Sequence, residues 1–380
     1  MLNNIELRGA AVEQASYNGV DTIVIMMCKE CMAGLDYMKL PASVRDVVAV
    51  LAEKKTDFFE AGSIERVTLL ENGKLLNILV VGCGEGLECK PYSFRKAAGA
   101  VARELHALKS EQAALIAAIT LNPKRAHYLN AMAEGLYLGA YTFTEYKSKK
   151  DAVPLCKVAV LSKVEGAEEI LLKAKITAEA VSFSRDLANH PGNVINPLTM
   201  AEKAAQVAEE LNLELEILDE EAMAAKGMHA LLAVGQGSDV PSRLITLKYN
   251  GAEDAPYVAY VGKGITFDSG GISIKPGENM GEMKDDMTGS AVVLGAIKAI
   301  AALKLKCNVM AVLACAENMP SGKAQRPGDI VRAANGKTIE VVNTDAEGRM
   351  VLADAVWYAC QQGAAKVIDI ATLTLSLIHI

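Results

Sequence analysis

The alternation of short apolar runs with amphipathic segments is the feature that most restricts how this chain can fold. In residues 1–163, four strand-like runs alternate with two helical patterns. The runs are residues 22–27, 76–81, 113–119 and 157–161, and the helical patterns are residues 92–108 and 125–141. Alternation of this kind is typical of an α/β domain with a largely parallel sheet. We therefore predict an N-terminal α/β domain with a mixed or parallel sheet.

A second α/β unit follows the first. Residues 164–189 are rich in Ala, Glu, Lys and Leu and predict one helix, which His190, Pro191 and Gly192 end. Beyond it we expect helices at 200–211, 289–303 and 349–361, and strands at 213–218, 244–249, 257–261, 308–314 and 366–370. A chain of 380 residues usually forms two domains. We predict an N-terminal domain at 1–163, a linking helix at 164–192, and a C-terminal domain with a central, largely parallel sheet at 193–380.

Composition limits the partners of the chain. The net charge of −7 disfavours nucleic acid as the main partner, although a local basic patch stays open. No apolar run approaches the roughly 18 residues that cross a bilayer, and residues 1–19 lack the pattern of a secretory signal. We expect a cytoplasmic protein without a membrane segment. Its eight cysteines are expected to be reduced, with Cys28 and Cys31 in a structural role.

Two segments concentrate charged side chains among glycines. The first covers residues 261–275 and continues to 284–289, and the second covers residues 343–349. Both are predicted to begin where an apolar strand ends. Ligands of open α/β sheets bind in the crevice beyond the carboxyl ends of the strands. We therefore expect convergence there of Lys263, Asp268, Asp345 and Glu347, with Asp286 just before a helix.

Four carboxylates in one crevice predict bound cations. Taken singly, an acid beside glycine is usually a solvated turn residue or a helix cap. Together they would repel one another unless cations neutralised them, and two divalent metals need bridging and terminal carboxylates of this kind. Lys263 and Lys275 both stand in this segment. Beside a dication, Lys263 can lose its proton and become a ligand.

The runs GKGITFDSGGISIKPG (262–277) and NTDAEGRMVLADA (343–355) closely resemble the signatures of the leucine aminopeptidase family. The resemblance implies that Lys263, Asp268, Asp286 and Glu347 hold one metal, and that Asp268, Asp345 and Glu347 hold the other. It implies catalytic roles for Lys275 and for Arg349, the latter holding a bicarbonate that acts as general base. It also implies that residues 193–380 form the catalytic domain, that the metals are zinc or manganese, and that the substrates are peptides with a free N-terminus and a leucine-type first residue. Met283 matches a position that lines the side-chain pocket. Members assemble as hexamers.

The end of the chain departs from the family. Members usually have glycine directly after Thr-Leu-Thr and continue well beyond it. Here Leu375 follows Thr374, and the sequence ends at Ile380. We expect a C-terminal truncation that leaves the ligand set complete but makes residues 1–380 poorly active and poorly assembled. His379, in that end, is not expected to bind metal.

Other functions remain open at this point. They are a DNA-binding architectural role, an inactive scaffold, another two-metal hydrolase such as a phosphatase, and phosphate binding by the glycine turn at residues 82–86. The glycine turn alone is weak support for a phosphate site, because such turns usually serve only to connect a strand to a helix.

Overall fold

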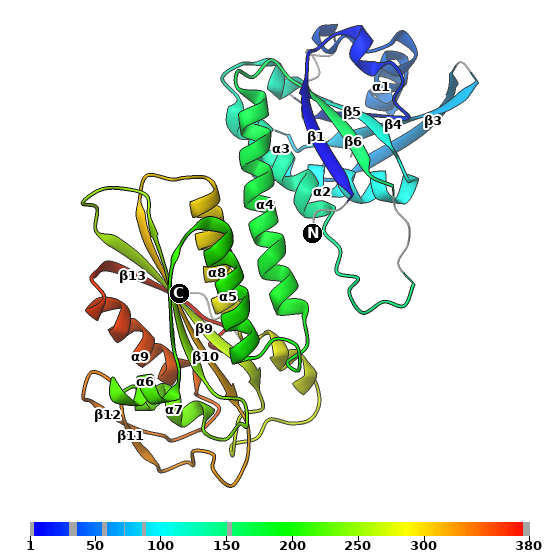
Figure 1. Cartoon of the computed structure of the whole chain (residues 1–380). Coiled ribbons are helices and arrows are strands. Elements are labelled where there is room, and N and C mark those ends of the chain that lie inside the picture. The colour runs from blue at the N-terminus through cyan, green and yellow to red at the C-terminus, as the bar shows by residue number, and fades with distance from the viewer. Residues whose placement is uncertain are drawn as a thin grey trace. The chain divides into compact units, whose positions relative to one another are not determined.

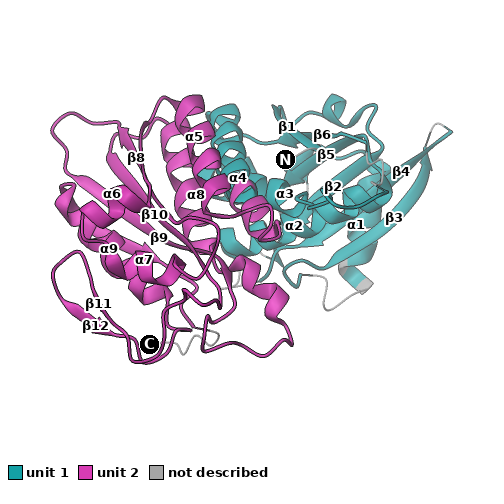
Figure 2. Cartoon of the chain, turned by 60° about the horizontal axis from the view of Figure 1, so that its bottom comes forward, with its two compact units in different colours: residues 1–182 teal, residues 183–380 magenta. Residues whose placement is uncertain are grey.

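The computed structural model describes residues 4–29, 36–54, 59–71, 73–85, 89–149 and 154–374. The chain divides into two compact units, Met1–Ser182 and Phe183–Ile380 (Figure 2). The division falls inside one long helix, α4 (Ala167–Asn189), where the sequence predicts a linking helix at 164–192.

Unit 1 contains a six-stranded sheet with the order β1-β6-β5-β2-β4-β3 (Figure 1). Neighbouring strands are parallel except for β3, which is antiparallel to β4. All six residues of β2 are buried, as expected for a central strand that is covered on both faces. The strands are β1 (Ile5–Ala10), β2 (Thr22–Met27), β3 (Ile64–Glu71), β4 (Lys74–Gly82), β5 (Gln112–Ala117) and β6 (Cys156–Leu161).

The helices of unit 1 cover both faces of this sheet and give it two apolar cores. On one face, Val24 and Leu79 pack in a cluster with Phe94 of α2 (Pro91–Leu108) and Leu136 of α3 (Ala126–Gly139). On the other face, the cluster includes Val44 of α1 (Ala42–Lys54). The unit also contains the short 3₁₀ helices η1 (Gln14–Tyr17) and η4 (Ala118–Leu121).

Unit 2 contains a five-stranded sheet with the order β13-β9-β10-β8-β7. β9 is parallel to β10 and β13, while β8 is antiparallel to both β10 and β7, so only β8 runs against the others. A two-stranded ribbon of β11 (Ile330–Arg332) and β12 (Thr338–Glu340) lies outside the sheet. The sheet strands are β7 (Glu214–Leu218), β8 (Arg243–Asn250), β9 (Tyr257–Asp268), β10 (Asn308–Asn318) and β13 (Ala364–Ile370).

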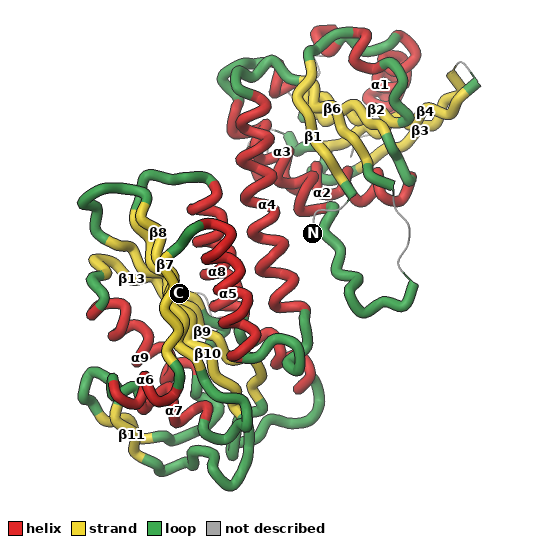
Figure 3. Tube along the Cα trace, in the orientation of Figure 1, coloured by secondary structure: helices red, strands yellow, loops and turns green. Residues whose placement is uncertain are grey.

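Helices also cover both faces of the sheet in unit 2 (Figures 1 and 3). α5 (Pro197–Leu211) and α8 (Thr288–Ala302) share one apolar cluster with β8 and β10. α6 (Glu220–Ala225), α7 (His229–Gly235) and α9 (Gly348–Gln361) share the other. The 3₁₀ helix η5 (Met280–Asp285) leads into α8. Both units are therefore α/β, as the sequence predicts.

The sequence predicts no membrane segment and reduced cysteines. Within the described ranges, no helix combines the length and apolar character that a bilayer span needs. Seven of the eight cysteines lie in the described part of the chain, and among them Cys156, Cys307, Cys315 and Cys360 are free thiols. Cys31 lies outside it, as does His379.

Candidate metal centre

Strand β9 carries the first two charged residues into the centre. The sequence predicts that this strand ends at Val261, but β9 continues to Asp268, so Lys263 lies within the strand and Asp268 at its end. That prediction is wrong because Gly262 and Gly264 act here as packing positions and not as a turn. A Cβ at Gly262 would lie 2.5 Å from Ser290 Cα, so the glycine lets the first turn of α8 pack against the strand.

Lys263 is the buried cation of the centre. Its side chain is 3% exposed, and its Nζ lies 2.7 Å from both carboxylate oxygens of Asp286, donating a hydrogen bond to Oδ1. The same Nζ lies 2.8 Å from Glu347 Oε1 and donates to the carbonyl oxygen of Thr372 at 2.8 Å. Burial lowers the pKa of Lys263, but the charges of Glu347 and Asp286 and their hydrogen bonds outweigh burial and hold that pKa above its ordinary value. Lys263 is therefore an ammonium in this arrangement.

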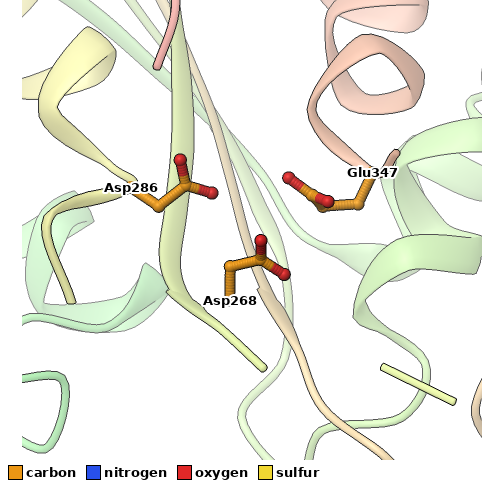
Figure 4. A group of neighbouring side chains, drawn as sticks. All are labelled: Asp268, Asp286 and Glu347. Carbon is orange, nitrogen blue, oxygen red and sulfur yellow. The ribbon is translucent and has the colours of Figure 1, made fainter. Parts of the chain in front are cut away.

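Asp268, Asp286 and Glu347 form a buried acidic group around this lysine. One carboxylate oxygen of each lies within 4.8 Å of the others, and the three side chains point toward one another (Figure 4). Burial raises the pKa of Asp286 to about 7 and also raises the pKa of Glu347, in both cases against the opposing effect of Lys263. Burial thus disfavours the ionised forms of these acids even beside Lys263, and a divalent cation at their oxygens would favour the ionised forms.

Asp345 and Lys275 are the other two charged residues of the centre. The Lys275 ammonium lies 2.8 Å from Asp268 Oδ2 and also forms an ion pair with Asp345 Oδ1. Burial lowers the pKa of Lys275, but hydrogen bonds to these two carboxylates outweigh it and raise the pKa overall. The structure therefore brings together two lysines and four carboxylates, which leaves an excess of two negative charges when all six groups are ionised.

Asn318 and Thr344 hold this arrangement in place, and sequence reasoning missed both. Asn318 ends β10, and its Nδ2 donates to Asp268 Oδ1 at 2.8 Å and to the carbonyl oxygen of Thr344 at 3.0 Å. Thr344 Oγ1 donates to the carbonyl oxygen of Gly270 at 2.6 Å and accepts from the amide of Ser273 at 2.8 Å. These bonds join the two motif segments. The available signal was an asparagine at the carboxyl end of a buried strand.

Thr372 is a third residue that the sequence did not single out. It follows β13, and its Oγ1 donates to Asp286 Oδ1 at 2.8 Å while its carbonyl oxygen accepts from Lys263. The ends of β9, β10 and β13 therefore supply Asp268, Asn318 and Thr372 to one place. Adjacent parallel strands present their carboxyl ends at the same sheet edge, which explains the convergence.

Arg349 is not part of this contact network. It lies in the first turn of α9, is exposed, and makes no hydrogen bond or ion pair with any residue that the structure describes. Met283 lies in η5 and is partly buried. The roles of both residues stay predictions.

The donor set fits a divalent cation. Glu347 is 2% exposed, and its Oε2 is buried without a hydrogen-bond partner in the described part of the chain. A buried oxygen of this kind is costly unless something satisfies it. Clustered carboxylate oxygens are suitable ligands for Mn²⁺ and Zn²⁺. The residues that would hold such an ion are therefore present and close together.

The glycine turn of unit 1 offers less to a ligand. The amides of Gly82, Cys83 and Gly84 donate to the carbonyl oxygens of Ser63, Met27 and Phe59, at 3.0, 2.7 and 2.7 Å. These three amides are therefore already bonded within the protein and do not face outward as a phosphate cradle. Gly86 lies outside the described residues.

Fold and site together define a two-unit α/β protein with a buried acidic, lysine-containing centre in its second unit. Residues 182–379 match the model of the cytosol aminopeptidase family catalytic domain, and residues 46–150 match that of its N-terminal domain. The chain belongs to the cytosol aminopeptidase family.

Individual relatives agree with this assignment. The probable cytosol aminopeptidase of Geotalea uraniireducens is 44% identical over 323 residues, which cover 82% of this chain and 65% of that protein. The cytosol aminopeptidase of Pseudomonas aeruginosa is 45% identical over 326 residues, which cover 83% of this chain and 66% of that protein. The chain thus spans less than two thirds of the length of these relatives.

Solved structures show the same fold. The bottromycin maturation enzyme BotP matches with a TM-score of 0.78 and 31% identity, covering 94% of this chain and 73% of that one. The same enzyme in complex with Mn matches with a TM-score of 0.78 and 31% identity, covering 93% and 73%.

Proposed function

We propose that this protein is a metal-dependent aminopeptidase that releases N-terminal amino acids, with a leucine-type preference, from peptides with a free N-terminus. The observation that carries the proposal is the buried group of Asp268, Asp286 and Glu347 around Lys263, in a chain that belongs to the cytosol aminopeptidase family. We infer two divalent ions, manganese or zinc. The Mn complex of the related BotP supports manganese.

The ligand assignment follows the family pattern position by position. Lys263, after losing its proton, would hold one ion together with Asp268, Asp286 and Glu347, and Asp268, Asp345 and Glu347 would hold the other, with Asp268 and Glu347 shared. When bound, two such ions supply a water nucleophile near neutral pH and polarise a carbonyl group. The two lysines contact different carboxylates among the proposed ligands. Lys263 contacts Asp286 and Glu347. Lys275 contacts Asp268 and Asp345.

Other side chains would direct the reaction to the first peptide bond. Asp286 would pair with the free amino group of the substrate, which places the first carbonyl group in the centre. The Lys275 ammonium would donate to the oxyanion that develops there, a contribution of about 3–4 kcal/mol for a well-placed donor. Arg349, exposed at the start of α9, would hold a bicarbonate as general base. The proposal includes a cytoplasmic location, which agrees with the names of the cytosol aminopeptidase relatives. It also includes a homohexamer.

The test is hydrolysis of Leu-Gly by the full chain. We expect activity with Mn²⁺ or Zn²⁺, loss of activity with a chelator, and recovery when metal is returned. N-acetyl-Leu-Gly should not be cleaved, because the blocked amine cannot pair with Asp286. Equal rates on the two substrates would refute the exopeptidase proposal.

A matched pair of variants connects the activity to the acidic centre. Glu347→Gln should lose bound metal and activity together, as measured by elemental analysis and by the peptide assay. Glu340→Gln makes the same chemical change at an exposed position in β12 and should leave both unchanged. If metal is bound with full stoichiometry but no peptide or aminoacyl amide is cleaved, the inactive-scaffold alternative is supported instead.

A further inference from the structure

The two lysines of the centre are held in different ways. Lys263 belongs to β9, is 3% exposed, and contacts three oxygen-bearing residues, Asp286, Glu347 and Thr372. Lys275 lies on the loop that follows β9, its side chain is 16% exposed, and among the described residues its ammonium forms ion pairs only with Asp268 and Asp345. Of the two, Lys275 has the freer side chain.

The loop backbone fixes the base of Lys275 while its side chain reaches back to the end of the strand. The amide of Lys275 donates to the carbonyl oxygen of Ser269 at 2.9 Å, which closes the loop on itself. Gly270 and Gly271 have φ values of +86° and +68°, a conformation that side-chain-bearing residues adopt rarely. Movement of the ammonium therefore needs only rotation about the four-carbon stem, with no change in the loop.

The ammonium of Lys275 uses carboxylate oxygens that the proposed second metal would also need. Asp268 Oδ2 lies 2.8 Å from Nζ, and Asp345 Oδ1 is its other partner. Asp345 is assigned to the second ion alone, and Asp268 to both. A divalent ion and an ammonium at the same oxygens would repel each other. They cannot both occupy this position.

We propose that Lys275 is an internal counter-cation of the Asp268 and Asp345 pair, which the second divalent ion displaces when it binds. Displacement frees the ammonium for the substrate carbonyl group, so that metal binding and presentation of Lys275 are one linked event. Before displacement, the ion pairs keep two of the four carboxylates neutralised. This inference rests on the proposed function, because it assumes that divalent ions bind at these carboxylates.

The main test is calorimetric titration of the metal-stripped full chain with Mn²⁺. The wild-type protein should bind two ions. Lys275→Met keeps the unbranched side chain as far as Cε but removes the charged group. It should bind one of the two ions about 10- to 100-fold more tightly, since a charge-assisted hydrogen bond no longer has to be broken. Lys275→Arg keeps the positive charge and should not gain affinity.

Lys284→Met is the matched control. Lys284 lies in η5, two residues before Asp286, and its Nζ donates to the backbone carbonyl oxygen of Asn189 at 2.8 Å. The substitution removes the same charge from the same unit without freeing a carboxylate. Its Mn²⁺ affinities should match those of the wild-type protein, which separates local displacement from a change in overall charge.

A second measurement follows Lys275 itself. Reductive methylation of the wild-type protein, mapped by mass spectrometry, should modify Lys275 faster with Mn²⁺ than without it, while Lys284 reacts at the same rate in both. Unchanged or weaker Mn²⁺ binding in Lys275→Met, together with Lys275 labelling that Mn²⁺ does not accelerate, would overturn the inference while leaving the proposed function intact. A wild-type chain that binds no Mn²⁺ or Zn²⁺ and cleaves no peptide would overturn both.

Discussion

The two units share a fold class but differ in what they bury. Among the described residues, the buried polar side chains of unit 1 are all uncharged; they are Thr22, Ser93, Ser110, Thr120 and Ser182. Unit 2 buries five charged side chains, namely Lys263, Asp268, Asp286, Glu347 and Asp354. Charged groups are seldom fully buried without partners. The α/β architecture therefore does not create the centre, and the side chains at particular strand ends do.

The two units differ in the residues at the carboxyl ends of their central strands. In unit 1, β2 and β4 end at Met27 and Gly82, and each is followed by a buried cysteine. In unit 2, β9 and β10 end at Asp268 and Asn318. Asp354 of α9 shows the other way to bury a charge, because its carboxylate accepts hydrogen bonds from the amides of Leu231 and Ala334 at 2.9 and 2.7 Å. Lys263, Asp268, Asp286 and Glu347 are instead held by ion pairs.

The largest effect should come from removing the buried cation. Lys263→Met leaves Asp286 and Glu347 without their ion-pair partner, and the free energy of unfolding of unit 2 should fall by about 3–5 kcal/mol. Trp357 of α9 is the single tryptophan of the chain, so its fluorescence during urea unfolding reports on unit 2.

The loss in Lys263→Met should also depend on pH. Burial raises the pKa of Asp286 to about 7. Lys263 opposes this rise, so the pKa of Asp286 should be higher still in Lys263→Met. Between the two pKa values only the wild-type carboxyl group is ionised and gains from a cation, so the loss should grow as the pH rises through 7. A loss that is equal at pH 6 and pH 8 would contradict this account.

An intermediate effect is expected for Asn318→Ala. Asn308, at the other end of β10, is the matched control position. Both are buried, and each side chain makes two hydrogen bonds, those of Asn308 being with Ala252 and Ala255. Either substitution by alanine should lower stability by about 1–3 kcal/mol. Only Asn318→Ala should weaken Mn²⁺ binding, by about 10- to 100-fold, because only Asn318 orients Asp268. Equal Mn²⁺ affinity in the two variants would show that Asn318 is merely structural.

The smallest effect is expected in unit 1. Thr120 is buried, and its Oγ1 donates to the carbonyl oxygen of Ala117 at 2.9 Å. Thr120→Val removes one neutral hydrogen bond and should cost about 0.5–1.5 kcal/mol. Hydrogen exchange in peptides from residues 112–121 should accelerate, while the Trp357 transition and Mn²⁺ affinity stay unchanged. A shift of either would show that the two units are not as separable as their buried groups indicate.

Periodicity predicted most of the elements, and local packing explains where it failed. Strand β2 has the bounds that the sequence predicts, and α2 differs by one residue. β9 was predicted too short because two glycines next to Lys263 were interpreted as a break, although Gly262 admits the backbone of α8 and Gly264 admits the Ser290 side chain and the backbone of β10. β5 was predicted too long, since residues 118–121 turn into a 3₁₀ helix.

The sequence predicted which charged residues form the candidate site, but not which lysine pairs with which carboxylate. The clustering of Asp268, Asp286 and Glu347 agrees with the expected convergence at the strand ends. Which lysine pairs with which carboxylate depends on side-chain directions in three dimensions, and no spacing rule gives these. Asn318 and Thr372 were missed for the same reason, because their hydrogen-bond partners Asp268 and Asp286 lie 50 and 86 residues away in the sequence.

Gly348, the first residue of α9, limits how this chain can evolve. A Cβ at this position would lie 2.6 Å from Lys263 Cε, and Lys263 cannot withdraw because three oxygen-bearing neighbours hold its Nζ. Glycine is also among the poorest helix formers. Selection for a more stable helix alone would favour alanine at position 348, whereas selection for an intact centre would retain glycine. Whether position 348 tolerates alanine thus depends on whether helix stability or the intact centre is selected, because the added Cβ would favour the first and disturb the second.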